Sequence, residues 1–418
     1  MAFVLKRNFI YQILFALCIA VPYLGNYELT FAVWCFTVFL TLKNYYSLTF
    51  LKYAFCFLLI LILAFFSTNY SEAEPFFAIR DITYLLKPVL GLFLGYQICR
   101  FNYTNTFRTI VNVGFAIAVM HILIMIHSVI VYGAATVNDI RFYSGYFSDF
   151  EVYALIILIF HEKFGIVLSK KKFYILTAVV GFSAFMYLAR SNFIQFIILY
   201  MGIKGYFILN KRAIIAIISF IVLTLVSYSA ILYINPKRNG EGFEAFLYKI
   251  KVAPTEPFKT RIDEDDYKDF NDNYRSVEMN FTLNQVSNDG TKAIIFGQGL
   301  GSQIDLKQEV YLGDMNLRYI SVLHNSFMTV LLKSGVLGIL LLLFSIYLLY
   351  NRNKTDIPIN YNINMLLMGT AVFLVVSNWV LMGYYFTQDS KSILVGLLLA
   401  YIEITRKKLA AEQLKPSI

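Results

Sequence analysis

Residues 321–350 read SVLHNSFMTVLLKSGVLGILLLLFSIYLLY. From Phe327 onward the apolar residues form a continuous run and do not alternate with polar ones, so the segment predicts a helix rather than a strand. A helix needs about 20 mostly apolar residues to cross a bilayer, and comparable runs recur along the chain. Only helices and closed barrels satisfy every backbone polar group in lipid. The sequence therefore predicts an all-α, polytopic membrane protein.

The composition supports this prediction. The chain has 418 residues, of which 58% are hydrophobic and only 15% are charged. A soluble domain carries about 25% charged residues, so an ordinary water-exposed surface is excluded. The net charge of +10 does not indicate nucleic acid, because Lys and Arg gather in the cytoplasmic loops of membrane proteins. We expect membrane lipid, and no nucleic acid, as a partner.

The apolar runs predict about twelve transmembrane helices. They divide the chain into helices 1–9 over residues 1–234, a large loop over 235–321, and helices 10–12 over 322–418. The predicted bounds of the twelve helices are 9–25, 28–42, 48–66, 76–98, 109–131, 143–160, 173–189, 192–209, 213–234, 322–350, 361–383 and 390–405.

The distribution of basic residues predicts the orientation, because short cytoplasmic loops carry an excess of Lys and Arg. With the N-terminus inside, the inner segments hold 17 basic residues and the short outer loops hold 4, namely Arg80, Arg141, Arg190 and Lys391. We therefore expect both termini in the cytoplasm and the large loop outside.

The large loop over 235–321 is polar and too long to be a turn, and loops of this length usually have structure or function. Within it, NDNYRSVEMNFTLNQVSNDG at 271–290 predicts a helix, which one of the residues 271–273 caps and Gly290 ends. FGQGLGS at 296–302 lacks the G-K-[ST] of a phosphate-binding loop. We interpret it as a turn that lets two backbone segments approach closely.

Two arginines are candidate anion-binding residues, because charge near the membrane is costly and often functional. Arg190 lies in YLARSNFIQF at 187–196, in a predicted outer turn, where its forked head suits a diphosphate. An anchor to lipid headgroups explains the same position. Arg275 begins the predicted loop helix, and a solvated surface arginine is the simpler interpretation of that residue alone.

His324 is the histidine predicted to lie near both the outer aqueous surface and the membrane. His121 and His127 fall inside the fifth helix, and His161 lies on the cytoplasmic side. A neutral imidazole is a suitable general base, although a histidine that only bonds the backbone at a helix start explains the position equally well. Lys333 lies about 13 Å along the same helix, where it pairs with a carboxylate, reaches a lipid phosphate or snorkels.

These segments, in this order, resemble the bacterial O-antigen polymerase and O-antigen ligase superfamily. Arg190 and the helix after it resemble the outer Ser-Arg turn of the family, although the order here is Ala-Arg-Ser. Arg275 followed by FGQGLG resembles the loop helix and the glycine-rich element of the family. HNSFMTVLLKSGVLG at 324–338 resembles the His-Asn signature, and RFYSGYFSDFEVYALIILI at 141–159 resembles a turn that opens a helix. The resemblance covers roughly residues 140–345.

The resemblance implies a GT-C-like glycosyltransferase of the bacterial inner membrane that acts at the periplasmic face without a metal or another cofactor. Its donor is an undecaprenyl-diphosphate-linked glycan. As the glycosidic bond breaks, the diphosphate gains negative charge, which Arg190 and Arg275 would neutralise. His324 would take the proton of the acceptor hydroxyl, and attack from the opposite face would invert the anomeric centre.

The sequence departs from the family pattern at two places. Asp149-Phe150-Glu151 stands where the family often has Asn-x-Asn, and Lys333 stands where it often has an acidic or polar residue. Both departures change the expected substrate contacts. We keep Arg141, Asp149, Glu151 and Lys333 as secondary candidates, with Asp149 or Glu151 as an alternative base.

The first hypothesis is a polysaccharide polymerase with a lipid-linked glycan as donor, a second lipid-linked glycan as acceptor, and a chain-length regulator protein as a further partner. The close alternative is an O-antigen ligase, which transfers the finished glycan to lipid A core. A polysaccharide or lipid-linked sugar transporter is the third hypothesis. Transporters normally show repeated halves, and we find no internal repeat.

Overall fold

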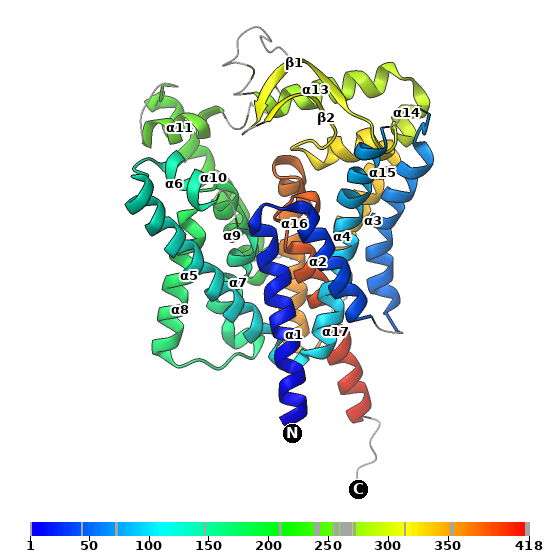
Figure 1. Ribbon diagram of the computed structural model, residues 1–418. Coiled ribbons are helices and arrows are strands. Elements are labelled where there is room, and N and C mark those ends of the chain that lie inside the picture. Colours follow the sequence, from blue (N-terminus) through cyan, green and yellow to red (C-terminus); the bar gives the residue numbers. More distant parts are fainter. Residues whose placement is uncertain are drawn as a thin grey trace.

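The structure is a computed structural model, in which 79% of the residues are helical (Figure 1). It describes residues 2–42, 45–71, 74–145, 148–208, 211–237, 243–252, 254, 259, 270, 273–312, 315–351 and 355–413.

The α-helices are α1 (Ala2–Ala20), α2 (Tyr27–Leu40), α3 (Leu48–Ser67), α4 (Pro75–Phe101), α5 (Thr106–Tyr132), α6 (Val137–Ser144), α7 (Asp149–Ile159), α8 (Lys170–Met186), α9 (Arg190–Ile203), α10 (Lys211–Ile234), α11 (Phe243–Val252), α13 (Tyr274–Asn288), α14 (Thr291–Phe296), α15 (Ser326–Tyr350), α16 (Pro358–Val380) and α17 (Lys391–Gln413). Short 3-10 helices are η1 (Val21–Leu24), η2 (Tyr103–Asn105), η3 (His161–Phe164) and η5 (Gly383–Tyr385), and the strands are β1 (Ile304–Leu312) and β2 (Met315–Ile320).

Six helical segments in the described part of the chain are long and apolar enough to cross a membrane. They are Leu48–Ser67, Pro75–Phe101, Tyr103–Tyr132, Ile217–Ile234, Ser326–Tyr350 and Pro358–Val380. The structure therefore confirms a helical protein with several helices that suit a membrane, whereas the full set of twelve spans stays a prediction.

The predicted span over 143–160 is wrong as a single helix. The chain forms α6, leaves it at Gly145, whose φ is 115°, and starts the 11-residue α7 at Asp149. Ser148 caps α7, because its Oγ accepts a hydrogen bond from Glu151 N. Such a cap satisfies a free backbone N–H and fixes where a helix begins.

The centre of the helical part is the pair α4 and α17, whose backbones approach closely. A Cβ at Gly95 would lie 1.8 Å from the carbonyl oxygen of Ile393, and one at Gly396 would lie 2.0 Å from that of Leu92. Small residues permit this contact, which is a common way for membrane helices to associate. Helices α1, α2 and α3 pack against α4, and α16 packs against α17.

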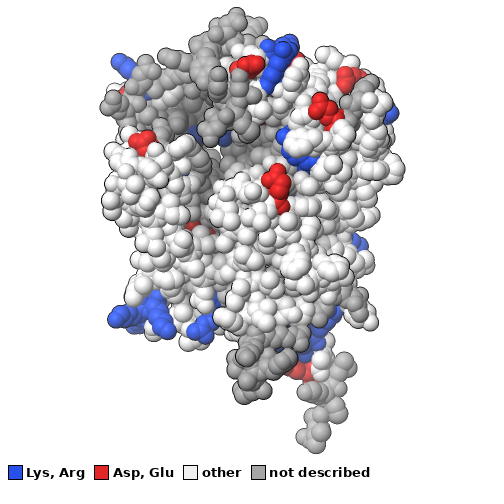
Figure 2. All heavy atoms as spheres, in the orientation of Figure 1, with Lys and Arg blue, Asp and Glu red and all other residues white. Residues whose placement is uncertain are grey.

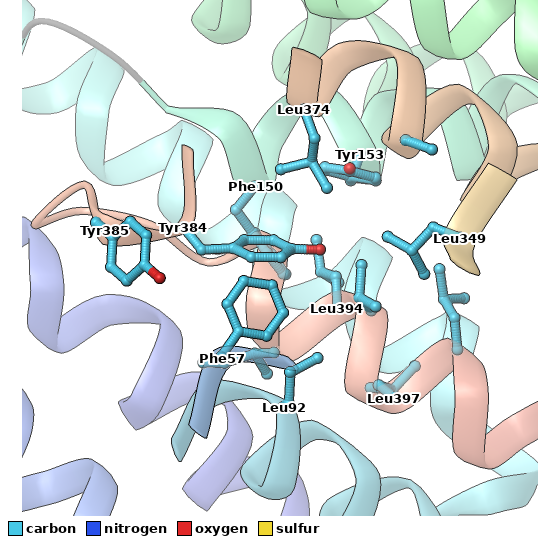
Figure 3. Packing of buried hydrophobic residues seen from close by; sticks show 14 of the residues in the cluster. Phe57, Leu92, Phe150, Tyr153, Leu349, Leu374, Tyr384, Tyr385, Leu394 and Leu397 are labelled. Carbon is cyan, nitrogen blue, oxygen red and sulfur yellow. The ribbon is translucent and has the colours of Figure 1, made fainter. Parts of the chain in front are cut away.

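Aromatic and aliphatic side chains from several helices meet beside this pair (Figure 3). Phe57 of α3 contacts the ring of Tyr384 edge-on, with the ring centroids 5.4 Å apart. The hydroxyl of Tyr384 forms a hydrogen bond of 2.9 Å with that of Tyr53, and all three side chains are buried. The buried hydroxyls are thus paired within an otherwise apolar core.

The two ends of the molecule differ. Figure 1 shows the N- and C-termini at one end and β1, β2, α13 and α14 at the other. Figure 2 shows Lys and Arg at both ends, with few charged side chains on the band between them. We call the end that carries α13 the loop end. A charge-poor band between two charged ends is what a membrane-embedded helical protein requires.

The predicted loop helix is confirmed as α13, which lies inside 271–290. Asn273 precedes it but makes no capping hydrogen bond, and positions 271 and 272 lie outside the described residues. Asp289 is the C-cap of α13. Gly290, which has a φ of 85°, follows it directly, so the helix ends beside the predicted glycine.

The antiparallel pair β1 and β2 was not predicted, because we expected a helix and a turn in the loop but no strand. Ile304 of β1 pairs with Ile320 of β2, and Leu312 pairs with Met315. The sequence between the strands is Gly313-Asp314, a dipeptide that favours a tight hairpin. The all-α prediction therefore needs one addition, a two-stranded sheet at the loop end.

The glycine-rich segment at 296–301 crosses α15 where that helix is interrupted. Gly335 has a φ of 64° and a ψ of −163°, which breaks the helical backbone. At this break Gln298 N donates to Leu332 O at 2.8 Å, and Gly299 N donates to Lys333 O at 3.2 Å. We call this contact between 296–301 and 332–335 the glycine crossing. The predicted close approach of two backbone segments is confirmed.

The glycine crossing is also joined to the end of α3. Ser67 Oγ donates to Phe296 O at 2.7 Å, and Leu300 N donates to Thr68 Oγ1 at 2.8 Å. The loop end is therefore fixed to two membrane-spanning helices, α3 and α15, by backbone groups that would otherwise be costly to bury.

Substitution of Gly335 by alanine should destabilise the protein strongly. The new Cβ would lie 2.3 Å from Ile295 O, in a backbone conformation that also disfavours side chains. We expect a loss of about 2–5 kcal/mol in unfolding free energy. The matched control is Gly133→Ala, which has a φ of 63° but an open space around its Cβ. Thermal unfolding in detergent measures both, and equal losses would contradict the role of the crossing.

Candidate functional site

His324 lies at the loop end, immediately before α15. Asn325 caps this helix, because its Oδ1 accepts from Phe327 N and Met328 N. The cap fixes the backbone of the preceding residue and so positions the imidazole. The side chain of His324 is 46% exposed, so the ring is accessible at the surface of the molecule.

A buried carboxylate holds His324 in place. Glu278 of α13 accepts one hydrogen bond from His324 N and another from His324 Nδ1, each 2.9 Å long. Glu278 itself is 0% exposed. With Glu278 as a carboxylate, which only accepts hydrogen bonds, Nδ1 carries the proton and Nε2 is the basic nitrogen. The arrangement makes His324 a pre-oriented proton acceptor.

Tyr274 completes the surroundings of this pair. Its ring meets that of His324 edge-on, with the centroids 5.6 Å apart. Burial first, and then the negative charge of Glu278, raise the pKa of Tyr274 above its ordinary value. The phenol therefore stays neutral and contributes an apolar wall beside the imidazole.

The sequence did not single out Glu278. It stands three residues after Arg275 in a polar helix, where a solvated carboxylate is the ordinary interpretation. Its spacing from Arg275 places both on one side of α13. This i, i+3 relation to a candidate residue was the available signal, but burial became visible only when α13 packed against the start of α15.

The structure places Arg275 at the loop end, whereas Arg190 lies at the start of α9. Arg275 lies in the first turn of α13 and is half-buried. Arg190 begins α9 and follows Ala189, which packs with Leu381 just past α16. Two residues before Leu381, Trp379 contacts Phe327 of α15. The convergence of both arginines on one diphosphate stays a prediction.

The carboxylate of Asp149 is occupied by other groups of the protein. It accepts from Ser390 Oγ at 2.6 Å and from Lys391 Nζ at 2.8 Å, and it is fully buried. Lys391 also pairs with Asp389 at 2.6 Å. These contacts join α7 to the start of α17, and they favour a structural role for Asp149 over that of the base.

Glu151, two residues further into α7, is also fully buried. Its Oε1 accepts from the hydroxyl of Tyr187 at 2.9 Å. The ring of Tyr187 stacks on His121 with a centroid distance of 3.7 Å, and His121 Nδ1 bonds Ser183 Oγ at 2.8 Å. His121 of α5 thus contacts Ser183 of α8 and Tyr187, which follows that helix, and Glu151 belongs to the same buried group.

Lys333 pairs with a carboxylate, one of the three outcomes that the sequence left open. Its Nζ lies 2.5 Å from Asp81 Oδ2, and both side chains are 1% exposed. The same Asp81 oxygen accepts from Gly301 N at 2.7 Å. The pair therefore ties α4, α15 and the glycine crossing together, and the ammonium is not at the surface where substrate would arrive.

Arg141 lies in α6 and is half-buried. Its carbonyl oxygen accepts from Gly145 N at 3.0 Å, and Asp139 forms a capping box with Thr136 at the start of the helix. The described contacts place Arg141 in a well-capped short helix and give it no contact with His324.

No family model and no curated protein matches the chain.

Among the described residues there is no group of three or more His, Cys, Asp or Glu side chains suited to hold a metal. The acidic run DEDD at 263–266, in which two aspartates stand one residue apart, lies outside the described residues. Independence from a metal therefore stays a prediction. The described part offers a histidine–glutamate pair with Arg275 one turn away on α13, a set suited to proton transfer beside an anionic group.

Proposed function

We propose that this protein is a membrane polysaccharide polymerase. It joins undecaprenyl-diphosphate-linked oligosaccharide units by metal-independent, inverting glycosyl transfer at the periplasmic face of the bacterial inner membrane. The observation that carries the proposal is the accessible imidazole of His324, held by the buried Glu278 one helical turn from Arg275. The ordered resemblance over residues 140–345 supports the same chemistry.

The proposed reaction has one displacement step. The acceptor hydroxyl attacks the anomeric carbon of the donor and passes its proton to His324 Nε2. The bond from that carbon to the diphosphate oxygen breaks, and its electron pair leaves with the lipid diphosphate. Arg190 and Arg275 stabilise the developing charge through forked, permanently charged donors. Glu278 keeps the imidazole in the reactive tautomer and stabilises the imidazolium that forms.

The test of the function is the length of the lipid-linked glycan in a deletion strain. Accumulation of single repeat units on the carrier is expected for a polymerase. Full-length chains that remain on the carrier, with none on lipid A core, would instead identify a ligase. Normal surface polysaccharide would contradict both.

The proposal includes an orientation, with both termini in the cytoplasm and residues 235–321 in the periplasm. It is supported by the excess of basic residues in the predicted inner segments and by the position of both termini opposite the loop end. In a cysteine-free background, a single cysteine at Leu283 should react with an impermeant maleimide in intact spheroplasts, whereas one at Leu409 should react only after lysis. Both side chains are exposed, at 43% and 37%. The reverse labelling pattern would invert the orientation.

Substitution of His324 should remove the proposed base. We expect His324→Ala to lower kcat by about 10²–10⁴-fold with saturating lipid-linked substrate. Glu278→Gln should lower kcat less, by about 10–100-fold, with little change in KM, because it disturbs the imidazole without touching substrate. Glu278→Asp keeps a carboxylate, so its kcat should fall less than that of Glu278→Gln.

The control for these variants is His127→Ala, a substitution on the exposed side of α5, which should leave kcat unchanged. Near-normal kcat in the His324→Ala enzyme would rule out the base and return attention to Asp149 and Glu151.

Arginine-to-lysine variants test the diphosphate clamp. Arg190→Lys and Arg275→Lys keep the charge but lose the fork, so each should reduce polymer formation about tenfold or more. Arg318→Lys is the control, because Arg318 is exposed on β2 and bonds Asp305 at 2.8 Å. Full polymer at normal expression in both Arg190→Lys and Arg275→Lys would refute the clamp.

A further inference from the structure

Arg80 is an arginine of the loop end that the site described above does not use. It lies in the second turn of α4, one of the membrane-spanning helices, and is half-buried. Its Nη2 donates to Ser321 Oγ, and Ser321 precedes His324 by three residues. Three residues span at most about 11 Å, so Arg80 lies close to the candidate base.

Arg80 forms no ion pair in the described part of the chain. The neighbouring Asp81, whose charge acts on Arg80, directs its carboxylate to Lys333 and to Gly301 N. The Nε of Arg80 is buried without a hydrogen-bond partner among the described residues. A partly buried guanidinium without an ion pair is stabilised when an anion approaches it. Arg80 is therefore a candidate to bind an anionic ligand.

The surroundings of Arg80 combine a cationic group with apolar surface. The guanidinium lies 4.8 Å from the ring centroid of Phe77 and 5.9 Å from that of Phe76, which orient it by cation–π contact. On the same turns, Phe76 is 67% and Ile79 is 62% exposed. A fixed cation beside exposed apolar side chains fits a phosphate that carries a hydrocarbon chain.

We propose that Arg80 forms a second phosphate site, which binds the diphosphate of the lipid-linked acceptor while Arg190 and Arg275 hold that of the donor. This inference rests on the proposed function, because a polymerase uses two substrates that each carry a polyprenyl diphosphate. Because Arg80 bonds Ser321, three residues before His324, an acceptor diphosphate bound by Arg80 would hold the acceptor close to the base. The ligand class is a polyprenyl diphosphate, and an ordinary phospholipid headgroup is the competing source of phosphate.

The test is calorimetric titration of the purified full chain with farnesyl diphosphate, in nanodiscs that contain only zwitterionic phosphatidylcholine. The unmodified protein should bind two equivalents, and Arg80→Gln should bind one. Arg80→Lys should keep two equivalents, one of them about tenfold weaker, because the charge remains and the fork is lost. The control Arg318→Gln, at the same end of the molecule, should keep both.

Equal binding by Arg80→Gln and the unmodified protein would overturn the inference. So would an effect of Arg80→Gln that is confined to thermal stability in nanodiscs with anionic phosphatidylglycerol, since that identifies a headgroup anchor. The double variant Arg190→Gln, Arg275→Gln separates the two proposals. If it keeps two equivalents while Arg80→Gln loses one, the donor clamp fails and the Arg80 site stands.

Discussion

The glycine crossing is the contact on which the arrangement of the loop end depends. Residues 296–301 bond the backbone of α15 at its break, and Lys333 beside that break reaches Asp81 of α4 at 2.5 Å. Because the ion pair is buried, its attraction offsets the free-energy cost of desolvation only if both groups keep their hydrogen bonds, including the one from Gly301 N to Asp81. The crossing therefore fixes the positions of α4, α14 and α15 relative to one another. As a result α13, which precedes α14, packs against the start of α15.

The position of α13 determines what His324 can do. Without α13 the histidine would be a half-exposed residue before a helix, without either of its hydrogen bonds to Glu278. With α13 in place, Glu278 accepts from both His324 N and His324 Nδ1, so the ring has one orientation and one tautomer. The orientation of His324 thus depends on packing within α15 at Lys333 and Gly335, which lie nine and eleven residues after the histidine.

The sequence predicted those features that local patterns determine. Continuous apolar runs identified the membrane helices, and the glycines at 297, 299 and 301 indicated a close backbone approach without a phosphate. It did not reveal Glu278, because the burial of a carboxylate depends on a contact between segments 46 residues apart. The apolar pattern over 143–160 did not reveal the break at Gly145, whereas the resemblance at 141–159 indicated a turn that opens a helix there. The β1–β2 pair was missed because a polar loop hides a short alternating pattern.

The charged residues near the membrane fall into two groups, and the difference is informative. Lys333 with Asp81, and Lys391 with Asp149 and Asp389, are buried pairs that balance one another and join helices. Arg80 is half-buried and forms no ion pair among the described residues. Asp81 is the next residue in the same helix, and adjacent helical residues do not face each other, so its carboxylate pairs with Lys333 of α15 instead. The guanidinium of Arg80 therefore remains beside Ser321 without a carboxylate partner, and the proposed acceptor-phosphate site rests on this difference from the buried pairs.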